Sequence, residues 1–236
     1  MEKVLHRNHT RGKGEHGWLS TRYSFSFADW YEPKRMGFGK LRVINDDLIA
    51  PASGFGAHGH KDMEIVTLVT EGTLTHKDSL GNTGTIPAGD VQAMSAGTGV
   101  VHAEYNDSAD EPLALFQIWI ETDQPNATPR YAQQSVGFSD EPGLTTLIVP
   151  EGSDEDGLPI HQDAYVHRVV LDAEHPYEYQ LRNPEHGVYI FVIDGDVQVT
   201  GEELGKRDAI GVWGVDSIEL SSTEAASLLL FEVSLH

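Results

Sequence analysis

Two histidines with one glycine between them stand just before an apolar run. The stretch GFGAHGHKDMEIVT covers residues 54–67 and contains His58 and His60. On a β-strand, side chains at i and i+2 project from one face about 7 Å apart, so both imidazoles can reach the same ion. The spacing alone is weak evidence, because a chain with 12 histidines among 236 residues is expected to contain about 0.6 such pairs by chance.

A second pair, His102 and Glu104, repeats this spacing. It lies in GTGVVHAEYN (97–106), after a glycine-rich bend and inside a strand-like run. Two strand-spaced pairs can aim four ligands into a small barrel. The pattern therefore favours a metal site made by His58, His60, His102 and Glu104 over the alternative of core histidines held by hydrogen bonds.

The remaining histidines and aromatic residues receive structural interpretations. His76 has the inward parity of Leu74, and we expect it to make a cross-strand hydrogen bond rather than to bind an ion. Four large aromatic side chains near the start of the chain are expected to be core: Trp18, Phe25, Phe27 and Trp30.

The elements that position these residues are predicted to be strands. Alternation of apolar and polar residues, bounded by turn residues, recurs at 24–30, 65–78, 113–122, 189–200 and 227–235. No long helical period is present, and at most a short helix is expected around 130–136 or 223–226. Many short strands with turns between them predict an all-β barrel or sandwich.

The chain is predicted to contain two similar units. IVTLVTEGTLTHKD, which includes Gly72, is echoed by VYIFVIDGDVQVTG, which includes Gly195. The proline-containing polar stretch ETDQPNATPRYAQQ reads as a connection between packed units. We expect a first barrel at 1–125, a linker at 126–136 and a second barrel at 137–236, in which no histidine takes the places of His58, His60 or His102.

Composition excludes several mechanisms. The chain has no cysteine, so a metal must be held by nitrogen and oxygen ligands. The net charge is −21, and residues 131–236 contain 4 Lys or Arg against 20 Asp or Glu, which disfavours binding to nucleic acid or anionic membranes. No apolar run is long enough to cross a bilayer and no export signal is evident, so we expect a cytoplasmic protein.

Several motifs resemble a known family. GFGAHGHKDMEI, TEGTLTHKDSLGNTG and PAGDVQAMSAGTGVVHAEYN resemble the cupin metal site, and more closely that of the pirin family, including the bacterial pirin-like quercetin 2,3-dioxygenases. RGKGEHGWL, SFSFADWYEP and FGKLRVINDD extend the resemblance over nearly all of the first 125 residues. It implies a bicupin: two tandem jelly-roll barrels with one metal ion in the N-terminal barrel and none in the C-terminal barrel.

The resemblance leaves two candidates for the fourth ligand. The general cupin pattern nominates Glu64, whereas the pirin pattern, with Glu two residues after the third His, nominates Glu104, which we choose. Glu64 is then a supporting partner or a cap at the barrel mouth. The sequence departs from the family pattern at Gly59, where proline is frequent, and at Tyr23, where histidine is common.

The implied cofactor is one divalent ion, with Fe(II) suggested by the family and Cu, Ni, Co, Mn or Zn as alternatives. The implied function is oxygenation of a small phenolic substrate: Glu104 takes the proton of a flavonol hydroxyl, dioxygen opens the ring and carbon monoxide leaves. The alternative is a metal-dependent, redox-sensing regulatory protein. The two differ in the cavity, because a catalyst needs an apolar pocket beside the ion.

Overall fold

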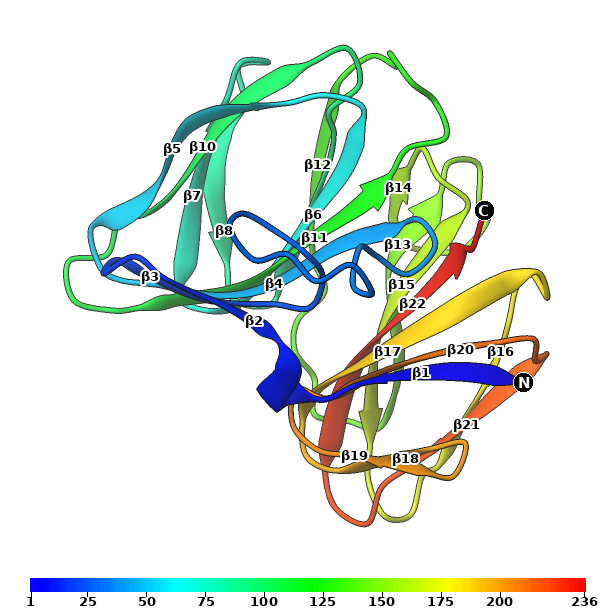
Figure 1. The fold of residues 1–236 in the computed structure, drawn as a ribbon. Helices are drawn as coiled ribbons and strands as arrows, with labels where there is room; N and C mark the ends of the chain where they lie inside the picture. The colour runs from blue at the N-terminus through cyan, green and yellow to red at the C-terminus, as the bar shows by residue number, and fades with distance from the viewer.

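Two β lobes make up the protein, which we describe from a computed structural model covering all 236 residues. Each lobe pairs one seven-stranded sheet with one four-stranded sheet, and every pairing is antiparallel except that of β13 with β14 (Figure 1). The single helical segment is the 3₁₀ turn η1 (Asn8–Thr10). The predicted all-β architecture of two barrels is confirmed.

The first lobe carries the proposed ligands. Its large sheet has the order β12 (Arg130–Ser135), β9 (Asp90–Ser95), β6 (Met63–Glu71), β11 (Leu113–Glu121), β4 (Leu41–Ile49), β3 (Leu19–Tyr23) and β2 (Gly12–Glu15). Its small sheet has the order β5 (Ser53–His60), β10 (Val100–Asn106), β7 (Thr73–Asp78) and β8 (Thr83–Pro87).

The second lobe repeats this arrangement. Its large sheet has the order β1 (Glu2–His6), β20 (Ala209–Trp213), β17 (His186–Asp194), β22 (Ala226–Ser234), β15 (Ala164–Leu171), β13 (Gly143–Pro150) and β14 (Leu158–Ile160). Its small sheet has the order β16 (Tyr177–Gln180), β21 (Ser217–Ser221), β18 (Val197–Val199) and β19 (Glu202–Leu204).

The strand orders explain the internal repeat. The small sheets β5-β10-β7-β8 and β16-β21-β18-β19 match strand for strand, as do β9-β6-β11-β4 and β20-β17-β22-β15. Gly72 and Gly195 occupy equivalent turns with φ of 77° and 82°, a region that glycine enters without strain. Where β5 and β10 carry histidines, β16 and β21 contribute Tyr179, Ile218 and Leu220 to a packed apolar core.

Two features cross the predicted division at 1–125, 126–136 and 137–236, which we keep as a proposal. Strand β12 lies within 126–136 and pairs with β9 of the first lobe. Strand β1 belongs to the start of the chain but pairs with β20, at the edge of the second lobe's large sheet (Figure 1).

Three local expectations were wrong. Residues 24–30 do not form a strand, because the backbone reverses at Ala28, with φ of 49°, and Phe27 bridges to Trp30 across the turn. Residues 130–135 form β12 instead of a helix, since the exposed edge of β9 supplies backbone partners. The expected helix at 223–226 is a bend that leads into β22.

The large sheets of the two lobes share one apolar core. On β11, Phe116 and Ile118 face the second lobe and join a cluster with Phe191 and Phe231 of β17 and β22. The residues between them, such as Gln117, point into the first barrel by strand alternation. Phe38 packs over Gly187, where an added Cβ would lie 2.7 Å from its ring, so glycine makes room for this contact.

A half-buried carboxylate joins the lobes beside this core. Asp46 accepts a hydrogen bond from Arg11 at 3.1 Å and forms an ion pair with Arg207 at 2.9 Å. The Arg11 side chain is only 2% exposed. Asp46 therefore compensates a guanidinium that water does not reach.

Replacing Asp46 by alanine should lower the free energy of unfolding by about 3 kcal/mol, because a buried guanidinium would lose its counter-charge. Urea unfolding measures the change. In the control Asp194→Ala, which breaks an exposed pair with Lys206, the loss should stay below about 1 kcal/mol. Equal losses in the two variants would contradict a compensating role for Asp46.

The histidine of β1 should make stability depend on pH. His6 is buried against Tyr189, 2.9 Å from its hydroxyl, and burial together with the Arg35 charge lowers its pKa to about 4. Between pH 6.5 and 4 the unfolded chain binds a proton here that the folded chain does not, so stability falls as pH falls. Urea unfolding measures the free energy of unfolding over this range. It should fall less steeply in His6→Gln than in the wild type, with slopes that differ by up to about 1.4 kcal/mol per pH unit. Parallel pH profiles would refute this.

Candidate metal centre and its cavity

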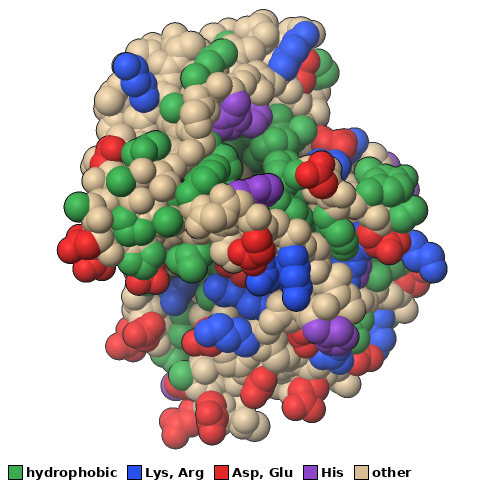
Figure 2. All heavy atoms as spheres, turned by 60° about the vertical axis from the view of Figure 1, so that its left-hand side comes forward, with side chains coloured by type: hydrophobic (Ala, Val, Ile, Leu, Met, Phe, Trp, Pro, Cys, Tyr) green, Lys and Arg blue, Asp and Glu red, His purple; other side chains and the backbone are tan.

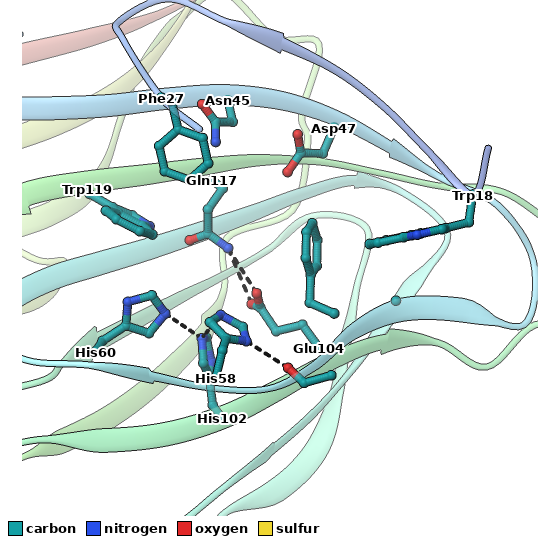
Figure 3. A pocket seen from close by; sticks show the side chains of 13 residues that line it. Trp18, Phe27, Asn45, Asp47, His58, His60, His102, Glu104, Gln117 and Trp119 are labelled. Atoms are coloured by element: carbon teal, nitrogen blue, oxygen red, sulfur yellow. Dashed lines mark hydrogen bonds between the residues drawn. The ribbon is translucent and has the colours of Figure 1, made fainter. Parts of the chain in front are cut away.

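Three imidazoles meet inside the first barrel. Strands β5 and β10 are neighbours, and their register places His58 directly opposite His102. Nε2 of His102 lies 2.9 Å from Nε2 of His60 and 3.1 Å from Nε2 of His58 (Figure 3). The convergence that the two spaced pairs predicted for the histidines is therefore present in the structure.

The nitrogens face one another in a way that suits a cation. Nδ1 of His58 donates to the carbonyl oxygen of Gly56 at 2.8 Å, so its Nε2 carries a lone pair in the neutral ring. A neutral His102 has at most one proton at Nε2 but faces two neighbours. At least one of the two contacts is therefore not an ordinary hydrogen bond, and a shared divalent ion would bring the nitrogens together favourably.

The separations also match a particular geometry. Two nitrogens bound at about 2.1 Å and at right angles lie about 3.0 Å apart, whereas a tetrahedral pair lies about 3.4 Å apart. The observed 2.9 and 3.1 Å agree with adjacent positions of an octahedron. The three histidines thus fit a divalent ion with further positions open.

Two of the three histidines are held in the neutral form that binds metals. Burial, followed by the nearby His58, lowers the pKa of His60 to about 4 and that of His102 to about 3. Imidazole must be unprotonated to coordinate an ion. The site is accordingly ready for a cation at neutral pH.

Glu104 lies beside this cluster, but its carboxylate is turned toward the opposite sheet. It accepts hydrogen bonds from Gln117 at 3.1 Å (Figure 3) and from Thr67 at 3.2 Å. Burial raises its pKa to about 7, and these two bonds offset part of the rise. Its ligand atoms group with those of His76 and His102, all within 4.8 Å, rather than with the three-histidine cluster. We keep its ligand role as a proposal.

His76 is the unexpected neighbour. It is fully buried, and Nε2 contacts the Asp78 carboxylate at 3.1 Å, two residues further along the same strand, so the expected cross-strand bond is wrong. Its Nδ1 has no partner. The structure therefore contains two overlapping clusters, one with His58 and His60 and one with His76 and Glu104, which share His102.

The alternative carboxylate is not part of either cluster. Glu64 lies on β6, and its buried carboxylate accepts a hydrogen bond from Ser95 at 2.6 Å. Glu64 does not line the cavity beside the histidines. This arrangement supports the choice of Glu104 over Glu64.

A cavity of about 380 Å³ opens next to the three imidazoles. Its aromatic walls are Trp18 and Phe55, with ring centres 5.0 Å apart, and Phe27 and Trp119, with ring centres 5.3 Å apart. Trp18 and Phe27 therefore border the cavity, and their assignment to the core was wrong. In Figure 2, histidine side chains are visible at a hollow bordered by hydrophobic side chains.

Three polar residues of the cavity were missed from the sequence. Asn45 and Asp47 on β4 and Gln117 on β11 line it from the large sheet. Burial, followed by the nearby charges of Asp46 and Glu104, raises the pKa of Asp47 to about 7, although the neighbouring Thr21 hydroxyl lowers it in part. The sequence pattern that could have revealed these three residues is a polar residue at an inward-facing strand position, where apolar residues are otherwise expected.

The fold and the site define a bicupin, with the candidate metal centre in its first barrel. The pirin family model matches residues 4–120, and a quercetinase C-terminal cupin domain model matches residues 147–233. The chain is 42% identical over 229 residues to a quercetin 2,3-dioxygenase of Escherichia coli K12, covering 97% of both proteins. It is 42% identical to a pirin-like protein of Caulobacter vibrioides, covering 94% of the chain and 96% of that protein. The chain belongs to the pirin family.

Solved structures agree with this assignment. The crystal structure of YhhW from Escherichia coli superposes with a TM-score of 0.92 at 41% identity and covers 98% of the chain and 97% of YhhW. A structure of the same bacterial pirin in complex with nickel(II) gives a TM-score of 0.93 at 40% identity and covers 99% of each chain. No helix of the present structure is long and apolar enough to span a membrane.

The two histidine clusters can be separated by metal analysis. Loss of a residue that only supports a ligand lowers metal affinity roughly 10–100-fold. His58→Ala removes a ligand itself and should lower the affinity for a divalent ion by more than that. His76→Gln should keep close to one ion per chain. Equilibrium dialysis with nickel measures both variants. Loss of the ion in His76→Gln with retention in His58→Ala would place it in the other cluster.

Proposed function

We propose that this protein is a metal-dependent dioxygenase that opens the ring of a flavonol-type substrate and releases carbon monoxide. The observation that carries the proposal is that three convergent imidazoles and one buried carboxylate lie beside a cavity of about 380 Å³ with aromatic side chains in its walls. A cavity of this size suits a small multi-ring ligand. Relatives named quercetin 2,3-dioxygenase support the substrate class.

The ligand set we propose is His58, His60, His102 and Glu104, and the ion we propose is Fe(II). When bound, a divalent ion would supply Lewis-acid chemistry, polarising the substrate's enol oxygen and lowering the pKa of its hydroxyl. The nickel complex of the related bacterial pirin supports a divalent ion in this fold. The neutral imidazoles leave the net positive charge of the ion largely intact for this purpose.

The protein's own residues position the substrate and manage its proton. The rings of Trp18, Phe27, Phe55 and Trp119 offer flat apolar surfaces to an aromatic substrate and exclude water from it. Glu104, with a pKa raised to about 7, can accept the hydroxyl proton near neutral pH.

Two neighbours keep Glu104 in place for that transfer. Gln117 and Thr67 donate to its oxygens from the opposite sheet, which fixes the carboxylate against the cavity wall. In the overall reaction one dioxygen is incorporated, one carbon monoxide leaves, and the heterocycle becomes a phenolic ester.

The cavity also argues against the alternative of a regulatory protein. A redox-sensing binding protein has no need of an aromatic-walled space beside its ion, whereas an oxygenase does. The openness of the histidine cluster to this space favours the enzyme.

Aerobic turnover of quercetin tests the function. Iron-loaded protein should consume the flavonol, seen as loss of the flavonolate absorption band. It should release one carbon monoxide for each flavonol consumed. Glu104→Gln should lower kcat by about 10²–10⁴-fold, because it removes the proton acceptor while keeping the side chain's shape.

His58→Ala supplies the background rate for this assay. Turnover that persists in it at the original rate would come from adventitious chemistry and would defeat the proposal. Stoichiometric bleaching without carbon monoxide would also contradict it, since oxidation of the flavonol without ring opening gives that result.

A further inference from the structure

The wall of the cavity across from the histidines is polar, and its side chains lack partners. Asn45 and Asp47 stand two residues apart on β4, so both point to the same side of the sheet, into the cavity (Figure 3). Each residue is only 4% exposed. Oδ1 of Asn45 and Oδ1 of Asp47 accept no hydrogen bond from the protein.

Their neighbours in the chain and in the sheet do have partners. Asp46, between them, points the other way and pairs with Arg11 and Arg207. Gln117, directly opposite Asn45 in the sheet, donates to Glu104.

The nearest hydroxyl does not satisfy Asp47. Thr21 lies opposite Asp47 on β3, close enough to affect its pKa, but its Oγ1 makes no hydrogen bond of standard geometry. A buried acceptor without a donor costs about 1–3 kcal/mol. Two such acceptors line one wall of this cavity. Hydrogen-bond donors on a bound ligand would offset their free-energy cost.

We propose that Asn45 and Asp47 bind hydroxyl groups on the part of the substrate remote from the metal ligands. The inference rests on the proposed function and narrows its substrate to a polyhydroxylated, multi-ring aromatic compound. The two residues are positioning and specificity-determining residues, separate from the histidines and Glu104.

The chemistry of the cavity selects this class. Carbonyl and carboxyl oxygens require donors, and the aromatic walls require flat apolar rings. The carboxyls of Asp47 and Glu104 and the net charge of −21 oppose carboxylates and phosphates. Phenolic hydroxyls combine a flat ring with an uncharged donor.

Binding, rather than turnover, tests the inference. Nickel-loaded protein under argon is titrated with quercetin and with 3-hydroxyflavone, which lacks the other hydroxyls, and quenching of tryptophan fluorescence reports occupancy because Trp18 and Trp119 line the cavity. Wild type should prefer quercetin. Asp47→Leu should reduce that preference about tenfold by weakening quercetin alone, and Asp47→Asn, which keeps an acceptor, should retain most of it.

Gln92→Leu is the matched control. Gln92 is fully buried and both of its amide atoms lack partners, but it does not line the cavity. Its replacement should leave the preference unchanged. Should Asp47→Leu fail to fold, methyl ethers of quercetin at the remote hydroxyls test the same donors on wild-type protein and should bind about tenfold more weakly.

The outcomes separate this inference from the proposed function. An unchanged preference in Asp47→Leu, or methyl ethers that bind as well as quercetin, would overturn the inference even if quercetin is turned over. If the protein shows the predicted preference for quercetin but does not turn it over, the inference is upheld and the proposed oxygenase function is contradicted. If wild type binds neither compound, both fall.

Discussion

Hydrogen bonds across the first barrel, from Thr67 and Gln117 to Glu104, connect the two sheets at the place where the site lies. Polar side chains in a barrel interior are costly unless they find partners. Here Gln92, Thr67, Gln117 and Asn45 form one row across four adjacent strands of the large sheet, each opposite the next. The middle of the row is satisfied by a carboxylate from the facing sheet, which fixes that carboxylate beside the histidines.

The same row explains why the cavity has two unlike walls. The small sheet supplies imidazoles from β5 and β10, and the pairing of these two strands brings them together. The large sheet supplies amides and a carboxyl, and only those in reach of Glu104 are satisfied. A ligand in the cavity would therefore meet nitrogen donors for a metal on one side and unpartnered oxygens on the other.

Much of the site could be predicted from the sequence because its metal side depends on local rules. Residues at i and i+2 on a strand share a face wherever the strand lies, so His58, His60 and His102 were found from spacing. Asn45 and Gln117 were not, because their meeting depends on the register between β4 and β11. The assignment of 24–30 to a strand failed for a related reason: alternation describes which residues are apolar, and it does not detect a reversal at Ala28.

The edge pairing of β1 with β20 has a consequence for how the chain reaches this state. Glu2–His6 is synthesised before the other strands of both lobes, whereas its partner Ala209–Trp213 is made after most of them. The first lobe can fold while β1 is still unpaired. Pairing of β1 with β20 then requires contact between residues that are nearly a whole chain apart. The second sheet can therefore be completed only after β20 has been made, and the first strand to be synthesised is among the last to pair.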